Sequence, residues 1–597
     1  MPTYKAPLRD MRFVARELFD FNEIRALKPY ADVSDELIDM VLSEMARFCE
    51  TELFPLNHTG DKEGCSIENG IVKPPKGFRE AYKKAVAAGW INPFAHVEHG
   101  GQGLPMATTA PVNEMLTASN LAFQTYFLGN AVYHALSLHA NEAIKDKYLP
   151  NLATGIWAGT MNLTEPQCGT DLGLTRARAD KQPDGTYAIT GTKIFITSGE
   201  HDFADNIIHM VLARTPDAPA GVKGISLFVV PKKVVNSDGS VGEANGVRCE
   251  SLEHKMGIKG STTCVMSFEN AKGELVGELN RGLRHMFTMM NEARLLVGIQ
   301  GLGLSDIAYQ NALAYARDRL QGRSLTGAKY PEKPADPLMV HADIRRMLLT
   351  AKALSEGGRM LTAWVARALD FSAYAESAEA RQASDDFVQL MTPVVKAFIT
   401  DCAQECTSVS LQVLGGYGYI QDYGLEQYVR DARITPIYEG TNGVQALDLI
   451  GRKLALDNGR LLPRFFGPVG EFIEANSNND ELKEFVEPLQ KAVDVLMQAT
   501  ATILSKAPKN PDEAGAAATD YLALFGYSAY AFLWARAAKI ALEKLKAGED
   551  KFYRSKVETA RFFMTKLLPR TRTYLATLNA GAAPVMQIAD EAFGPFD

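Results

Sequence analysis

The feature that most constrains the fold is a change of secondary-structure character that occurs twice along the chain. From about Ser34 to Gly155 the apolar residues have helical spacing, and Ser34 is a suitable cap for a helix that begins at Asp35. Near Trp157 the pattern becomes one of strands and turns, and near Arg281 long helical periods return. This order predicts helical domains before and after a separate β domain.

Two stretches carry the β pattern most clearly. Residues 186–197 and 224–231 alternate in polarity and are rich in β-branched side chains. Asp184-Gly185 and Asp238-Gly239 are typical of the turns between such strands. We therefore expect a small antiparallel β domain.

The predicted fold class is α+β and mainly helical, because long helical periods run around 283–320, 338–377 and 384–414, and 440–457 has the pattern of a last helix. With 597 residues the chain is too long for a single core. A linker around Gly467-Pro468 and 476–480 precedes three or more further helices. The expected domains are an N-terminal extension (1–33), an N-terminal helical domain (34–156), a middle β domain (157–280), a C-terminal helix bundle (281–460) and a helical C-terminal extension (461–597).

Charge and cysteine content narrow the possible partners. The formal net charge of −8 is poorly suited to non-specific binding of phosphate backbones. The seven cysteines show no Cys-x-x-Cys spacing, which favours reduced, buried thiols. The uncharged stretch between Glu114 and Glu142 is long enough to span a bilayer, but its scattered polar residues indicate buried helices. We expect a soluble cytoplasmic protein.

A single carboxylate, Glu439, stands in a suggestive setting. It lies between Ile437-Tyr438 and a Gly440-Thr441-Asn442 turn. Burial beside apolar side chains would raise its pKa toward the range that a general base needs. The alternative is structural, with Glu439 in the first turn of a helix capped by Thr441 or Asn442.

No nucleotide-binding, hydrolase or metal motif accompanies this carboxylate. No Gly-x-Gly-x-x-Gly follows a strand, and Gly415-Gly416-Tyr417-Gly418 lies between helical stretches. His96, Glu98 and His99 fit a turn better than a zinc motif, so we expect no metal site.

Three segments remain as candidates for the chemistry. They are Leu163–Asp171, Lys193–Gly199 and the run from Gln412 to Glu439. The first could hold a polar planar ligand through backbone amides and hydroxyls. In the second, Phe195 and Thr197 are two positions apart, which on a regular strand places both on one face.

Together and in this order, these segments resemble the acyl-CoA dehydrogenase family over roughly 35–460. The Thr-Glu-Pro-x-x-Gly-Thr-Asp run is similar to the family's first signature, with Cys168 where a smaller residue is usual. Gln-x-x-Gly-Gly-x-Gly is similar to the start of its second signature, in which Gln427 replaces the usual Lys or Arg and Asp431 restores the pattern.

The resemblance implies FAD bound without a Rossmann fold. It implies that Leu163 and Thr164 contact the pyrimidine end of the flavin, that Phe195 lies against the ring, and that Thr197 lies near N5. The remaining cofactor residues that it implies are Arg319 at the pyrophosphate, Gln412 and Gly416 at the adenosine, and Thr441. Because the family shares FAD across a subunit interface, the resemblance also implies a homodimer.

Glu439 matches the base of the family, which removes the α-proton of an acyl-CoA thioester while hydride passes to flavin N5. Tyr438, Gly440 and Arg294 are implied at the substrate. In some branches the base lies on an earlier helix, where this chain has Ala293. Glu292 is one position away, and that shift rotates a helical side chain by roughly 100°.

Residues 461–597 and the leader around Tyr4–Phe13 exceed the compact family pattern. Both additions resemble a branch that oxidises 3-(methylthio)propanoyl-CoA to methylthioacryloyl-CoA, with electron-transfer flavoprotein as the acceptor. Medium- or long-chain acyl-CoA dehydrogenases and acyl-CoA oxidases are the nearest alternatives.

The C-terminal extension suggests an alternative of another class. From Arg536 to Arg572 basic residues exceed acidic ones, and aromatic residues are interleaved. Such a surface could bind DNA or an anionic membrane, as in a membrane- or DNA-associated flavoprotein of the same fold. We favour a solvated helix face with inward-packed aromatic side chains, and hence no nucleic-acid or membrane partner.

Overall fold

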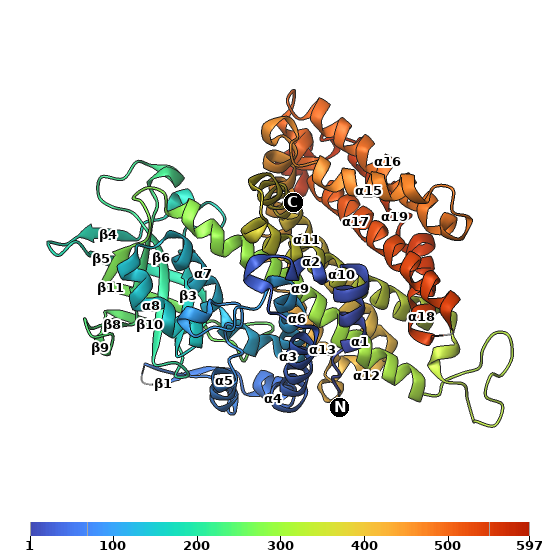
Figure 1. Ribbon diagram of the computed structural model, residues 1–597, viewed down its shortest axis with the longest axis horizontal. Coiled ribbons are helices and arrows are strands. Elements are labelled where there is room, and N and C mark those ends of the chain that lie inside the picture. Colours follow the sequence, from blue (N-terminus) through green and yellow to red (C-terminus); the bar gives the residue numbers. More distant parts are fainter. Residues whose placement is uncertain (1, 69, 549, 596–597) are drawn as a thin grey trace. The chain divides into compact units, whose positions relative to one another are not determined.

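The structure is a computed structural model that describes residues 2–68, 70–548 and 550–595. The chain forms two compact units, which are described separately (Figure 1). The N-terminal unit contains Asp32–Ala293 together with Tyr4–Ala6. The C-terminal unit contains the leader Pro7–Ala31 and the chain from Arg294 onward, so the division falls inside helix α9 (Gly282–Asp318).

Helices make up the first half of the N-terminal unit. They are α3 (Asp35–Phe48), α4 (Phe54–Glu63), α5 (Phe78–Ala87), α6 (Met106–Gln124), α7 (Gly129–His139) and α8 (Glu142–Thr154). Ser34 caps α3 as predicted, since its hydroxyl accepts a hydrogen bond from the Leu37 amide at 3.1 Å. The uncharged stretch forms α6 and α7, most of whose residues are buried. In the described chain, no helix is long and apolar enough to cross a membrane.

A seven-stranded sheet follows. Its strands are β3 (Trp157–Asn162), β4 (Arg178–Lys181), β5 (Tyr187–Thr197), β6 (Asn206–Ala213), β7 (Ser226–Pro231), β10 (Val247–Leu252) and β11 (Thr263–Leu275). The order is β3-β6-β7-β11-β5-β4, with β10 also paired to β11. All pairs are antiparallel except β3 with β6, which is parallel. A parallel pair needs a long crossover connection, and here the chain between β3 and β6 includes β4 and β5. Two hairpins accompany the sheet: β1 (Ser66–Glu68) with β2 (Ile71–Lys73), and β8 (Lys233–Val235) with β9 (Val241–Ala244).

Strand β6 is buried on both faces. Every residue of Asn206–Ala213 is buried. Ile208 and Met210 belong to a core shared with α7 and α8, whereas Val211 belongs to a core shared with β5 and β11. A strand covered on both faces loses the alternation of polar and apolar residues.

The C-terminal unit is helical and includes the leader. Its helices are α1 (Leu8–Arg12), α2 (Asn22–Arg25), the second part of α9, α10 (Ala342–Tyr374), α11 (Ala378–Val413), α12 (Gly416–Tyr419), α13 (Leu425–Ala432), α14 (Asn442–Asp448), α15 (Pro463–Asn476), α16 (Lys483–Lys506), α17 (Pro511–Ala547), α18 (Lys551–Phe562), α19 (Arg570–Asn579) and α20 (Ala583–Met586). The predicted long helices and the helical extension are both present. The mainly helical α+β fold class is confirmed.

Helix α17 of the extension packs closely against α10 and α11 (Figure 1). A Cβ at Gly526 would lie 2.2 Å from the Phe398 ring, and one at Gly357 would lie 2.5 Å from the Tyr530 ring. Trp534, which is fully buried, donates its indole N–H to the Ala353 carbonyl at 3.2 Å. The extension is therefore an integral layer of this unit.

Buried charges connect the leader to the extension. Arg359 on α10 pairs with Asp10 on α1 and with Asp306 on α9, while Lys556 on α18 pairs with Asp10 and Glu356. We call these five residues the leader–extension cluster. Burial would raise the pKa of Asp10, but the charges of Lys556 and Arg359 hold it below its ordinary value. Each charge in the cluster thus depends on partners from distant parts of the sequence.

Candidate active site

Glu439 lies in a strained turn between α13 and α14. Its φ is +57°, and that of the following Gly440 is +84°. The turn is closed by hydrogen bonds from the Tyr438 amide to the Ile434 carbonyl at 3.1 Å and from the Asn442 amide to the Pro436 carbonyl at 3.0 Å. A non-glycine residue in this left-handed region costs of order 1 kcal/mol or more, and such strain clusters at functional sites. Glu439 is therefore placed by the turn and not by a helix.

The helix-capping interpretation applies to a neighbouring residue. Thr441 is the N-cap of α14, and its hydroxyl accepts a hydrogen bond from the Val444 amide at 3.4 Å. Glu439 precedes that cap and lies outside the first helical turn. The Glu439 carboxylate therefore takes no part in capping α14.

The surroundings of Glu439 shift its pKa upward. Burial is the largest cause of the raised pKa, and the nearby cations Arg294 and Lys396 oppose it. Arg294 is buried and directs its Nε–H toward the Glu439 carbonyl at 3.4 Å, and Gln445 donates its side-chain amide to the same oxygen at 3.2 Å. A carboxyl group with a raised pKa beside two cations has the properties of a general base.

Tyr438 and Glu292 each have a defined partner. The Tyr438 hydroxyl donates to the Gln300 side chain on α9. Glu292 contacts His134 Nδ1 at 3.0 Å within the N-terminal unit. This pairing gives Glu292 a structural role of its own.

In the N-terminal unit, the two predicted flavin segments lie together. The Ile194 amide donates to the Thr164 carbonyl at 2.9 Å. Lys193, which is fully buried, donates its ammonium group to the Leu163 carbonyl at 3.0 Å and to the Glu165 carboxylate at 2.8 Å. The first segment is thus fixed to strand β5 through both backbone and side chain.

Strand β5 carries a β-bulge where Phe195 lies. Ile194 and Phe195 together oppose the single residue Val265 of β11, and Phe195 has a φ of +58°. The bulge breaks the alternation on which the one-face expectation for Phe195 and Thr197 rested. Lys193 is consequently buried although Phe195, two positions later, has 58% of its surface exposed.

The exposed groups of these segments fit a flavin. Phe195 offers an open aromatic ring, and the Thr164 and Thr197 hydroxyls make no hydrogen bond to any residue that the structure describes. An aromatic surface beside two free hydroxyls suits a planar ring system with polar edges. The sequence missed Lys193 and Glu165 here, although a lysine at a buried strand position would have been a usable signal.

Residues predicted at the pyrophosphate and adenosine also come together, within the C-terminal unit. Arg319 follows the end of α9, and its guanidinium carbon lies 5.5 Å from the centre of the Tyr417 ring on α12. Gln412 and Gly416 lie at the adjoining end of α11 and start of α12, and both are exposed. The three predicted residues therefore belong to one exposed region. Their role toward FAD remains a prediction.

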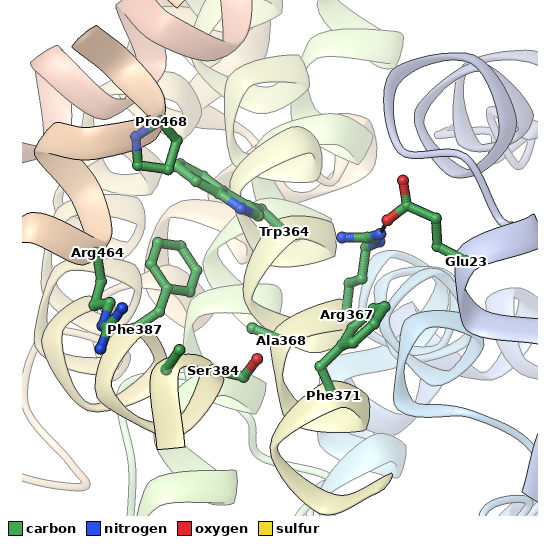
Figure 2. A pocket seen from close by; sticks show the side chains of 10 residues that line it. Glu23, Trp364, Arg367, Ala368, Phe371, Ser384, Phe387, Arg464 and Pro468 are labelled. Carbon is green, nitrogen blue, oxygen red and sulfur yellow. Dashed lines mark ion pairs between the residues drawn. The ribbon is translucent and has the colours of Figure 1, made fainter. Parts of the chain in front are cut away.

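A pocket of about 260 Å³ in the C-terminal unit is separate from these residues (Figure 2). Its walls include Trp364, Phe371 and Phe387, with Arg367 and Arg464 at its edges. Arg367 pairs with Glu23, and Arg464 faces the buried carboxylate of Asp386 at 3.6 Å. None of the predicted site residues lines it.

Several basic residues of the extension form ion pairs within the C-terminal unit. Arg561 pairs with Glu484 at 2.6 Å, Arg570 pairs with Glu405 at 2.7 Å, and Lys556 belongs to the leader–extension cluster. Among its aromatic residues, Phe552 and Tyr553 pack against Phe13 of the leader. These aromatic contacts agree with the expected inward packing of the side chains. Among the described residues no group of three metal-ligating side chains gathers.

Family models identify the class of oxidoreductase to which the chain belongs. Models of the acyl-CoA dehydrogenase N-terminal, middle and C-terminal domains match residues 35–156, 160–271 and 280–455, and an acetyl-CoA dehydrogenase C-terminal-like model matches 465–589. The chain belongs to the acyl-CoA dehydrogenase family, as its sequence motifs predicted.

Similar proteins span the whole chain. The 3-methylmercaptopropionyl-CoA dehydrogenase of Ruegeria pomeroyi is 43% identical over 575 residues, covering 95% of this chain and 96% of the relative. A butyryl-CoA dehydrogenase of Syntrophomonas wolfei is 33% identical and covers 99% of both chains. The crystal structure of an acyl-CoA dehydrogenase from Bacillus anthracis complexed with FAD has a TM-score of 0.74 and 22% identity, over 94% of this chain and 90% of that one. This likeness supports the fold, including the C-terminal extension.

Proposed function

We propose that the chain catalyses FAD-dependent α,β-dehydrogenation of an acyl-CoA thioester, with Glu439 as the base for the α-proton. The observation that carries the proposal is the strained turn that places Glu439 beside Arg294 and Lys396 with a raised pKa. FAD, when bound, supplies the acceptor for the β-hydride. Leu163, Thr164, Phe195 and Thr197 hold the flavin ring in this proposal.

The backbone of Glu439 has a second role in the proposal. Its N–H donates to no group in the described chain, so it is available to the thioester carbonyl oxygen. Such a donor stabilises the enolate-like charge that develops when the α-proton leaves, and one donor of this kind is worth about 10²- to 10³-fold in rate. The same residue would thus take the proton and stabilise the resulting charge.

We further propose 3-(methylthio)propanoyl-CoA as the substrate and methylthioacryloyl-CoA as the product. Support comes from the 43% identity to a relative named for that substrate, which extends over nearly the full length of both chains. Medium- and long-chain acyl-CoAs are the alternative substrates, with oxygen as the alternative acceptor to electron-transfer flavoprotein. A homodimer that shares FAD through Arg319, Gln412 and Gly416 completes the proposal.

Anaerobic mixing with a panel of acyl-CoAs tests the reaction and its substrate. We expect loss of the oxidised flavin absorbance, fastest with 3-(methylthio)propanoyl-CoA. No bleaching with any thioester would contradict the dehydrogenase assignment. Rapid reoxidation in air would indicate an oxidase.

Glu439→Gln tests the base. General base catalysis contributes about 10²- to 10⁴-fold, so flavin reduction should slow at least about 100-fold while the acyl-CoA still binds. Glu292→Gln is the matched control, because it removes the carboxylate of the alternative base position, which pairs with His134. Equal rates in the two variants would exclude Glu439 as the base.

A further inference from the structure

Lys396 is an isolated cation within the apolar middle of α11. It lies between Val395 and Ala397, and its side chain is fully buried. Burying an ammonium group is unfavourable unless it is hydrogen-bonded and paired. A lysine at this position therefore calls for a specific partner.

The partners of Lys396 belong to the turn that carries Glu439. Its Nζ donates to the Gly440 carbonyl at 2.8 Å and to the Asn442 side-chain oxygen at 2.9 Å. The Asn442 amide in turn donates to the Ala397 carbonyl at 3.1 Å. Helix α11 and the turn are thus joined by hydrogen bonds that run in both directions, from Lys396 to the turn and from Asn442 to the helix.

These hydrogen bonds hold the part of the turn whose backbone conformation is least favourable. Glu439 and Gly440 both have positive φ, and a Cβ at Gly440 would lie 2.7 Å from the Gln445 amide nitrogen. A strained turn persists only when its surroundings over-determine it. Lys396 holds the carbonyl of Gly440, the residue that follows the strained Glu439.

Lys396 also contributes charge. Burial lowers its pKa to about 8, against the opposing charges of Glu439 and Asp401, while Arg294 lowers it further. Asp448 at the end of α14, and Arg452 and Lys453 in the following π-helical turn (Leu449–Leu454), are further charged groups near Arg294. At neutral pH Lys396 is cationic and favours the ionised form of Glu439.

We propose that Lys396 is a positioning residue that holds the Glu439 turn through Gly440 and Asn442 and keeps the Glu439 carboxylate ionised. This inference rests on the proposed role of Glu439 as the base. Lys396 itself is assigned no contact with substrate.

Three substitutions separate geometry from charge. Lys396→Met removes both the hydrogen bonds and the charge, Lys396→Gln keeps a donor without charge, and Lys396→Arg keeps the charge. The rate of anaerobic flavin reduction at saturating acyl-CoA, expressed per bound flavin, is measured so that partial loss of folded protein does not enter. We expect Lys396→Met to slow reduction about 10- to 100-fold with the KM changed less than about threefold, because a lost charged hydrogen bond is worth about 1.5–3 kcal/mol. Lys396→Gln and Lys396→Arg should each recover part of the rate.

The pH profile gives a readout that general destabilisation would not move. Reduction requires ionised Glu439, so its rate rises with pH through the pKa of that group. Loss of the Lys396 cation raises this pKa further and should move the acidic limb to higher pH in the Met and Gln variants. In Lys396→Arg the limb should stay near its original position. Lys506→Met, which removes a lysine from a pair with Glu513 on the extension, is the control that should change neither quantity.

The outcomes distinguish this inference from the proposed function. Unchanged rate and acidic limb in Lys396→Met, with Glu439→Gln inactive, would overturn only the role of Lys396. A normal rate per bound flavin despite low flavin content would also overturn it, since the residue would then serve only stability. Persistent flavin reduction by Glu439→Gln would remove the base assignment itself.

Discussion

At the scale of single residues, two buried lysines do most to shape the candidate site. Lys396 is hydrogen-bonded to the turn that carries Glu439, and Lys193 joins the two predicted flavin segments. The Lys193 ammonium pairs with Glu165, whose carboxylate also accepts the Arg176 and Ala177 amides at 2.8 and 3.0 Å. Burial lowers the pKa of Lys193, and Glu165 opposes that shift. One ion pair thus organises the whole first segment.

Lys193→Met should destabilise the N-terminal unit and weaken FAD binding. Removing one partner of a buried ion pair costs about 3–5 kcal/mol, because the other charge is left without compensation. Urea unfolding and a titration with FAD measure the two effects. Lys181→Met, at an exposed position of strand β4, is the control and should change the free energy of unfolding by less than about 0.5 kcal/mol.

The double variant Lys193→Met/Glu165→Gln sharpens this prediction. Because it removes both charges, its loss of stability should be smaller than the sum of the two single losses. Strict additivity would show that the two side chains do not interact in solution.

At the scale of elements, the sequence predicted the parts with strong periodicity. The long helices α9, α10 and α11 and the strand β5 were foreseen because their apolar spacing is regular over many residues. The bulge at Phe195 was not, since it depends on the register with β11, which only the folded sheet defines. The partners of Glu439 could not be predicted for a similar reason, because Lys396 is distant in sequence and reaches the turn only through tertiary packing.

The loop between α9 and α10 is an element ordered by one carboxylate. Asp336, which is buried, accepts the Ser324 amide at 2.9 Å and the Tyr330 amide at 2.8 Å. Burial opposes ionisation, but the backbone amides and Arg323 hold the pKa of Asp336 at about 2. The part of the loop from Ser324 to Asp336 is therefore organised without a helix or a regular strand.

Asp336→Asn should loosen this loop while leaving the helices intact. An amide has a single acceptor oxygen, so it cannot serve all the donors that the carboxylate serves. Trypsin cleavage after Lys329 should speed up at least about tenfold, because proteolysis follows the population of the open form. The circular dichroism spectrum should stay unchanged. Equal cleavage rates in the variant and the parent would show that Asp336 does not order the loop.

At the scale of the whole molecule, the leader and the extension depend on each other. Lys556 of the extension pairs with Asp10 of the leader inside the leader–extension cluster, and the Tyr553 hydroxyl donates to Glu17 at 2.7 Å. Such buried charges are stable only when every member is present.

Lys556→Met should lower the stability of the C-terminal unit by about 3–5 kcal/mol, because Asp10 and Glu356 would lose a buried cation. Thermal unfolding measures this loss. Lys546→Met, which removes a lysine from an exposed pair with Glu481, should change stability by less than about 1 kcal/mol. Equal melting temperatures in the two variants would contradict a stabilising role for the cluster.

The pairing of the leader with the extension has a consequence for synthesis on the ribosome. Glu17 and Tyr553 are 536 positions apart. At about 5–20 residues per second, the leader emerges roughly half a minute to two minutes before its partner exists. During that interval the carboxylate of Asp10 must stay in water, and the final closure of this unit must wait until Lys556 has been synthesised.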